Sequence, residues 1–141
     1  MKPAHILLIE DNEGDIVLTL DAFEESKIKT TISVARNGEE AMNFLYQRGD
    51  YGGVARPDLI LLDINIPIYN GIEVLKKIKS DKTLKKIPVI MLTTSSQQRD
   101  VDSAYLNHAN SYVTKPIEMD DFLRAILKIE EFWLQLTTLS K

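Results

Sequence analysis

Several residue types suited to phosphoryl chemistry stand at the ends of the most apolar segments of this chain. They are two acids after the run at 5–9 (Glu10 and Asp11), one after 59–62 (Asp63), hydroxyls after 89–92 (Thr93, Thr94 and Ser95) and a lysine after 111–114 (Lys115). A carboxylate can act as a nucleophile toward phosphorus. A hydroxyl and an ammonium can stabilise the charge that spreads over phosphoryl oxygens. The pattern predicts a phosphoryl-transfer site, with Asp63, Thr93 and Lys115 as its reactive groups, if these segments meet.

The acids of this set also form a candidate metal site. Carboxylates as close as we expect for Glu10, Asp11 and Asp63 repel one another, and one of them would take up a proton unless a cation neutralised the group. Mg²⁺ is a hard cation that prefers oxygen ligands, keeps several waters and binds phosphates. We therefore expect Mg²⁺ as the cofactor, with Lys115 as a second positive charge for an approaching phosphoryl group.

The elements that must position these residues can be predicted from hydrophobic periodicity. Apolar runs typical of strands lie at 5–9, 31–35, 59–62, 89–92 and 111–114. Segments with helical periodicity separate them, and this alternation favours a parallel sheet with both faces covered by helices. The expected fold is an α/β, doubly wound, flavodoxin-like sandwich with a five-stranded parallel sheet in the order 2-1-3-4-5. Its ligand crevice would lie beyond the carboxyl ends of the strands.

The last helix is expected to be longer than the others, from about Met119 to about Leu136. Beside its main apolar stripe it carries Leu123, Leu127 and Leu134 on a neighbouring face. Exposed apolar patches often mark contacts with partners. We therefore expect this face to contribute to a homodimer.

Composition limits the class of protein. The 141 residues fit one domain, 1–141, and 17 basic against 21 acidic residues leave no basic surface from which direct nucleic-acid binding could be argued. There is no cysteine, which excludes thiolate chemistry and suits a reducing compartment. No apolar run is long enough to span a bilayer, and the start of the chain turns acidic too early for a signal peptide. The expected location is cytoplasmic, without a membrane partner.

Four motifs together carry a family resemblance. The segments LLIEDNEGD, LILLDINIPIYNG, VIMLTTS and YVTKP resemble the receiver domain of two-component response regulators, over a core of about 5–130 followed by a C-terminal helix extension of about 130–141. The loop at 47–58, LKKIPVIMLTTS and the tail IEEFW are similar to the small single-domain regulators paired with phytochrome-type histidine kinases.

The resemblance implies roles for individual residues. Asp63 would be the phosphoacceptor. Asp11 and Asp63 would supply carboxylate oxygens to Mg²⁺ and Asn65 its backbone carbonyl, with help from Glu10. Thr93 would bond a phosphoryl oxygen.

The resemblance also implies how the site would signal. Lys115 would pair with the phosphoryl group, and the peptide bond before Pro116 would be cis. Tyr112 stands at the family's aromatic switch position, so that Thr93 and Tyr112 would move together on phosphorylation.

A response regulator of this kind would receive its phosphoryl group from a sensor histidine kinase, and the narrower similarity implies phytochrome-type light signalling. It would not be an enzyme, beyond assisting its own phosphotransfer and autodephosphorylation. Only a few residues follow Trp133, so we expect signalling through a downstream protein partner or a phosphotransfer protein. A homodimer would form through the predicted helix around 101–108, the strand at 111–114 and the last helix, or through the C-terminal helix alone.

Three positions depart from the family pattern. Glu10 stands where aspartate is commoner, and its extra methylene could change metal ligation to a water-mediated contact. Thr94 replaces a smaller residue and would crowd phosphate access. Asn70 precedes Gly71 where aspartate is frequent.

Other readings of the same residues remain open. Asp15 is expected to cap the first helix or to favour its positive end. An aspartyl-nucleophile phosphatase would need a general acid two residues after Asp63, where Asn65 stands. A flavin mononucleotide binder would bring phosphate against Glu10 and Asp11, which would repel it. A degenerate receiver that serves only as an interaction module is a further alternative.

Overall fold

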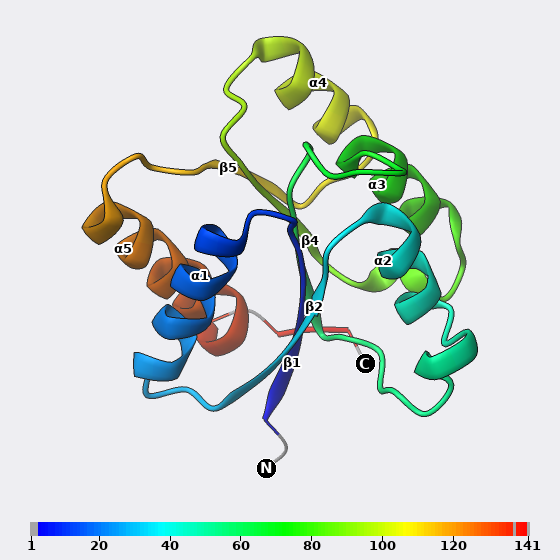
Figure 1. Cartoon of the computed structure of the whole chain (residues 1–141), viewed down its shortest axis with the longest axis horizontal. Helices are drawn as coiled ribbons and strands as arrows, with labels where there is room; N and C mark the ends of the chain where they lie inside the picture. Colours follow the sequence, from blue (N-terminus) through cyan, green and yellow to red (C-terminus); the bar gives the residue numbers. More distant parts are fainter. Residues whose placement is uncertain (1–2, 137, 141) are drawn as a thin grey trace.

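The five strands form one sheet in the order β2-β1-β3-β4-β5, and all neighbouring strands are parallel (Figure 1). This description rests on a computed structural model and covers residues 3–136 and 138–140. The strands are β1 (Ala4–Ile9), β2 (Thr30–Ala35), β3 (Leu59–Leu62), β4 (Val89–Thr93) and β5 (Ser111–Thr114). The predicted fold class and strand order are confirmed.

Burial along the strands explains why they could be recognised. Every residue of β3 and β4 is buried, because these strands lie inside the sheet with helices on both faces. The edge strands β2 and β5 are mostly half-buried, and their sequences show a weaker apolar signal. The parallel register pairs Ile9 with Leu62 and Thr93 with Thr114, so the carboxyl ends of these strands lie at one edge of the sheet.

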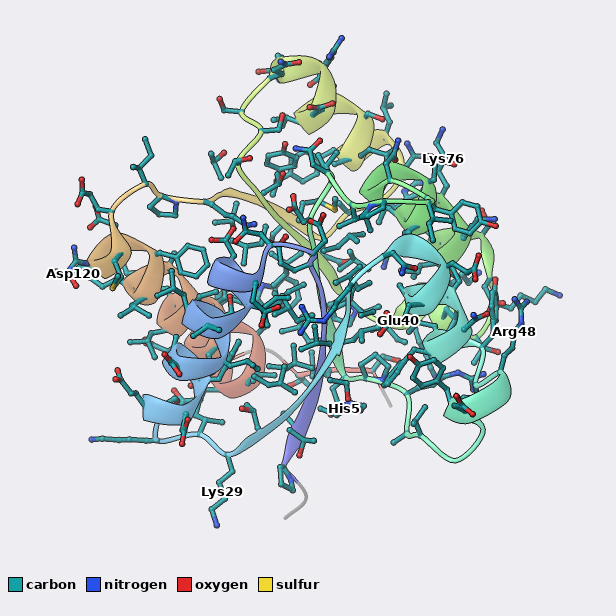
Figure 2. The ribbon with its side chains drawn as sticks, in the orientation of Figure 1. His5, Lys29, Glu40, Arg48, Lys76 and Asp120 are labelled. Carbon is teal, nitrogen blue, oxygen red and sulfur yellow. The ribbon has the colours of Figure 1, made fainter. Side chains whose placement is uncertain are left out.

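Helices cover the sheet in two groups, with α1 and α5 on one face and α2, α3 and α4 on the other (Figure 1). They are α1 (Glu13–Glu25), α2 (Gly38–Leu45), α3 (Gly71–Ser80), α4 (Gln98–Leu106) and α5 (Met119–Glu130). Buried aliphatic side chains fill both layers, while the labelled side chains of Lys29, Arg48, Lys76 and Asp120 point outward from the rim (Figure 2).

Asparagine side chains cap three of the helices that begin near the ends of the strands, at Asn12, Asn37 and Asn70. The Asn12 side chain accepts a hydrogen bond from the Asp15 amide at 2.9 Å, so Asn12 rather than Asp15 caps α1. Asp15 lies within the first turn, where a negative charge favours the positive helix end. Asn70 caps α3 and forms a capping box with Glu73. An asparagine at position 70 therefore has a clear structural use.

Gly71 allows α3 to begin directly against the end of β3. A Cβ at this position would overlap the Asp63 carbonyl oxygen and the backbone of Ile64. The Gly71 amide donates to the Ile64 carbonyl oxygen at 2.8 Å. The backbone at the Asp63 carbonyl and at Ile64 is thus held by packing that only glycine permits.

The C-terminal helix continues beyond α5 as a π-helical segment, Glu131–Leu136. The predicted end at about Leu136 agrees with this segment, but the hydrogen-bonding pattern changes at Glu131. Residues 137 and 141 of the expected extension lie outside the described residues. Phe132 is 53% exposed and Leu127 40%, whereas Trp133 packs against the layer formed by α1 and α5.

Within the described residues, no helix is long and apolar enough to cross a membrane.

Candidate functional site

The predicted reactive residues meet where β1, β3, β4 and β5 end. The Asp63 amide donates to the Ile9 carbonyl oxygen at 3.0 Å, and the Lys115 amide donates to the Thr93 carbonyl oxygen at 2.7 Å. These bonds continue the sheet pairing by one residue past the strands. Glu10, Asp63, Thr93 and Lys115 are all buried at this edge of the sheet, despite their polar side chains.

Lys115 is the centre of the site. Its ammonium lies 3.3 Å from Oδ2 of Asp63 and 2.8 Å from Oδ2 of Asp15, and it also donates to Oε1 of Glu10. The lysine side chain is only 4% exposed, so its charge is neutralised by these acids rather than by water. The structure brings Glu10, Asp63 and Lys115 together as predicted, and it adds Asp15.

Asp15 is a member of the site that sequence reasoning missed. Its position in the first turn of α1 gave it an ordinary role at the helix start, and nothing in the local sequence connects it with Lys115, one hundred residues later. One signal could have found it: in a parallel doubly wound fold, the first turn of α1 and the residues after β5 lie at the same edge of the sheet.

Glu10, Asp11 and Asp63 offer oxygens that all lie within 4.8 Å of one another, which makes them a candidate metal site among the described residues. Asp11 is exposed, whereas Glu10 and Asp63 are buried. An all-oxygen donor set with one solvent-facing carboxylate fits a hard divalent cation that keeps part of its water shell. Asn65 is exposed beside this cluster, and its amide lies 3.4 Å from Oδ1 of Asp63.

The surroundings keep Asp63 ionised. Burial acts to raise the pKa of Asp63, but hydrogen bonds from Thr93 and Glu10, the charge of Lys115 and the Asn65 amide outweigh it and hold the pKa below its usual value. A carboxylate with this low pKa is available as a nucleophile at neutral pH.

Glu10 and Lys115 respond to the same crowding in different ways. Burial raises the pKa of Glu10 to about 7, although its hydrogen bond with Lys115 acts in the opposite direction. Burial alone would lower the pKa of Lys115, but hydrogen bonds to Asp15 and Glu10 and the charge of Asp63 raise it above its usual value. Lys115 therefore stays charged, while Glu10 is the acid that gains or loses a proton near neutral pH.

The two predicted switch residues are connected through the loop after β4. Thr93 is fully buried, and its hydroxyl oxygen lies 3.4 Å from the Ser95 amide. The Tyr112 hydroxyl donates to the Ser95 carbonyl oxygen at 2.8 Å, and the Tyr112 amide donates to the Tyr105 hydroxyl oxygen at 3.1 Å. The ring of Tyr112 is thus turned toward this loop. Thr94, which was expected to crowd the access of a phosphate, is exposed.

The expectation of a cis peptide bond before Pro116 was wrong. No cis bond occurs in the described part of the chain, so the Lys115–Pro116 bond is trans. Trans is the lower-energy form of a bond before proline, by about 0.5–1 kcal/mol.

Comparisons with known proteins agree with this architecture. The family model of the response regulator receiver domain matches residues 6–127. Response regulator Rcp1 from Synechocystis sp. strain PCC 6803 is 43% identical over 137 residues, which cover 97% of this chain and 93% of that protein.

Two solved structures are similar over nearly the whole chain. The phosphorylated cyanobacterial phytochrome response regulator RcpA superposes with a TM-score of 0.97 at 44% identity, covering 99% of this chain and 100% of the other. The Mn²⁺-bound form of Rcp1 gives a TM-score of 0.95 at 42% identity, with the same coverage. With the strand order and the acidic edge of the sheet already established, these matches show that the chain belongs to the response regulator receiver domain family.

Proposed function

We propose that this chain is a phosphorylation-dependent signalling switch in which Asp63 accepts a phosphoryl group from the phosphohistidine of a partner histidine kinase. Membership of the receiver family makes the chain a signalling protein rather than a classical enzyme, and it implies a kinase partner. The observation that carries the choice of Asp63 is its position: a buried carboxylate with a lowered pKa, 3.3 Å from the Lys115 ammonium.

In the proposed transfer, an Asp63 oxygen forms a bond to phosphorus while the bond from phosphorus to the histidine nitrogen breaks. The electron pair of the broken bond stays on the imidazole. Lys115 and the Thr93 hydroxyl would stabilise the negative charge on the phosphoryl oxygens, which carry most of the charge in such transfers. Because Lys115 already touches Asp63, it needs little reorganisation to do so.

Mg²⁺ is the proposed cofactor, held by the carboxylates of Asp11 and Asp63 and the Asn65 carbonyl, with Glu10 assisting. When bound, it would supply positive charge beside the phosphoryl group. The acidic cluster and the Mn²⁺-bound form of Rcp1 support a divalent cation in a site of this family.

Thr93 and Tyr112 are the proposed switch. A phosphoryl group on Asp63 would draw the Thr93 hydroxyl toward it, and the Ser95 backbone connects that movement to the Tyr112 hydroxyl. The result would be a changed surface around α4 and β5, which a downstream protein or phosphotransfer protein could read.

The proposed kinase is of the phytochrome type, since Rcp1 and RcpA support that pairing. The chain would act in the cytoplasm as one receiver domain, residues 1–141, with its core at about 5–130. Self-association would use the face formed by α4, β5 and α5 or the C-terminal helix. The exposed apolar side chains of Leu106 on α4 and of Leu127 and Phe132 near the C-terminus support these surfaces.

The proposal includes assistance by this chain in its own phosphotransfer and autodephosphorylation, and it excludes a turnover enzyme. A phosphatase with an aspartyl nucleophile would need a general acid at position 65, and the Asn65 amide cannot donate a proton in that way. Flavin mononucleotide is disfavoured because its phosphate would meet the carboxylates of Glu10 and Asp11. The residue at position 65 and the two carboxylates therefore disfavour both alternatives.

The test is incubation with Mg²⁺ and phosphoramidate, followed by intact mass measurement. The wild-type protein should gain one phosphoryl group that is stable in acid and labile in base, and Asp63→Asn should gain none. Asp21→Asn, which removes an exposed acid of α1, is the matched control and should be labelled like the wild type. Labelling that persists in Asp63→Asn would contradict the proposal.

A further inference from the structure

Asp15 contacts Lys115 from a helix, whereas the other residues of the site lie at the ends of strands. Its Oδ2 lies 2.8 Å from the Lys115 ammonium, closer than Oδ2 of Asp63 at 3.3 Å. The Asp15 side chain is 28% exposed and comes from the first turn of α1, whereas Glu10 and Asp63 follow strands and are buried. The lysine is therefore held between two elements, the end of β5 and the start of α1.

The requirements of helix α1 alone do not account for this contact. Asn12 already caps the helix, and Glu13 supplies a second negative charge in the same first turn. Glu13 pairs with Arg36 at the surface, in an arrangement typical of an exposed acid. Asp15 instead pairs with a lysine that is almost completely buried.

The three acids around Lys115 differ in whether they also belong to the candidate cation site. Glu10 and Asp63 belong to the cluster that could hold a divalent cation, and Asp15 does not. When a cation and a phosphoryl group draw on Glu10 and Asp63, the ammonium loses part of its pairing with them. A buried ammonium with too few partners is costly, so an acid that the cation does not draw on keeps Lys115 paired until the phosphoryl oxygens reach it.

We infer that Asp15 is a positioning residue that holds the Lys115 ammonium beside Asp63 while the other acids serve the cation and the phosphoryl group. The inference rests on the proposed function, because it assumes that Lys115 pairs with a phosphoryl group on Asp63. It adds a residue of α1 to a site otherwise built from the ends of strands.

Binding of beryllium fluoride, which imitates a phosphoryl group on an aspartate, tests this role in the full chain. Its affinity would be measured by fluorine NMR in the presence of Mg²⁺. Asp15→Ala should weaken binding by about tenfold, in the range typical when a residue that orients a ligand-binding group is removed. Asp15→Asn should lose less, because the amide oxygen can still accept a hydrogen bond from Lys115.

Glu13→Gln is the matched control, since it removes a charge from the same helix turn without touching Lys115. It should bind beryllium fluoride like the wild type. All variants would be checked for folding by amide NMR, so that affinity is compared between folded proteins.

Unchanged or tighter binding by Asp15→Ala would overturn the inference, because Asp15 would then be irrelevant to Lys115 or compete for it. An equal loss in Glu13→Gln would also overturn it, by assigning the effect to helix charge. Failure of the wild-type protein to bind would instead reject the proposed function, and this inference with it.

Discussion

The Lys115 ammonium lies 3.3 Å from Oδ2 of Asp63, although their strands are not neighbours in the sheet. β4 lies between β3 and β5, so the contact crosses the end of β4, where Thr93 is buried. An acid, an ammonium and a hydroxyl therefore meet at three adjacent strand ends. This arrangement supplies both the nucleophile and the charge stabilisation that the proposed phosphoryl transfer needs.

The close packing of α3 against Asp63 predicts a specific cost for a side chain at position 71. Gly71→Ala should lower the free energy of unfolding by about 1–3 kcal/mol, because the new Cβ would overlap the Asp63 carbonyl oxygen. Gly53→Ala is the control: no atom beyond the adjoining residues of the chain lies within 4 Å of a Cβ there, and the change should stay within about 0.5 kcal/mol. Urea unfolding measures both. Equal effects of the two substitutions would show that this contact does not constrain the site.

The exposed acid of the cluster offers a test of the metal site that leaves the core intact. Asp11→Asn should weaken Mg²⁺ binding by more than about tenfold, since even changes outside the ligands often cost that much. Calorimetric titration of the metal-free protein measures the affinity. Asp21→Asn, on the exposed side of α1, should bind Mg²⁺ normally. If both variants kept wild-type affinity, Asp11 would not be a ligand.

The raised pKa of Glu10 predicts how the stability of the metal-free protein depends on pH. Burial raises the pKa of Glu10 from 4.5 to about 7. Below pH 4.5 this group is protonated whether the chain is folded or unfolded. Between pH 4.5 and about 7 the folded protein holds the proton more firmly, so the contribution of Glu10 to the free energy of unfolding should fall as pH rises.

Urea unfolding with a chelator, across this pH range, checks that fall. Glu10→Gln should remove it, because the amide does not titrate. Mg²⁺ should oppose it, since the cation favours the ionised carboxylate. A wild-type contribution from Glu10 that increased with pH would contradict the assigned direction of the pKa shift.

The Tyr112 hydroxyl should stabilise the loop after β4. Tyr112→Phe removes its hydrogen bond to the Ser95 carbonyl oxygen and should lower the free energy of unfolding by about 0.5–1.5 kcal/mol. Phosphorylation by phosphoramidate should still occur, because the hydroxyl does not touch Asp63. Tyr46→Phe keeps the ring that faces Arg48 and serves as the control. The role assigned to Tyr112 is incorrect if its substitution changes stability no more than Tyr46→Phe does.

The sheet could be predicted from sequence because its inner strands must be apolar on both faces. The run at 59–62 coincides with β3, and 89–92 falls one residue short of β4, which includes Thr93. Parallel order then places the residues after each strand at one edge, which is why Glu10, Asp63 and Lys115 could be grouped before their contacts were known. The edge strand β2 was weaker in sequence because it is only partly buried.

Contacts that depend on side-chain reach could not be predicted in the same way. The sequence predicted for Asp15 only a role at the start of the first helix. Its distance from Lys115 depends on how α1 packs beside β5. The hydrogen bond between the Tyr112 amide and the Tyr105 hydroxyl likewise depends on the turn between α4 and β5. The isomer of the Lys115–Pro116 bond has no local sequence signal, and the family expectation failed there.

The central claim is that Asp63 carries the phosphoryl group, and chemical trapping tests it most directly. After incubation with Mg²⁺ and phosphoramidate, borohydride reduces an aspartyl phosphate to homoserine, and peptide mass spectrometry locates the modified residue. The account predicts homoserine at position 63 and at no other acid of the cluster. Homoserine at Asp11 or at Asp15, in place of position 63, would contradict it.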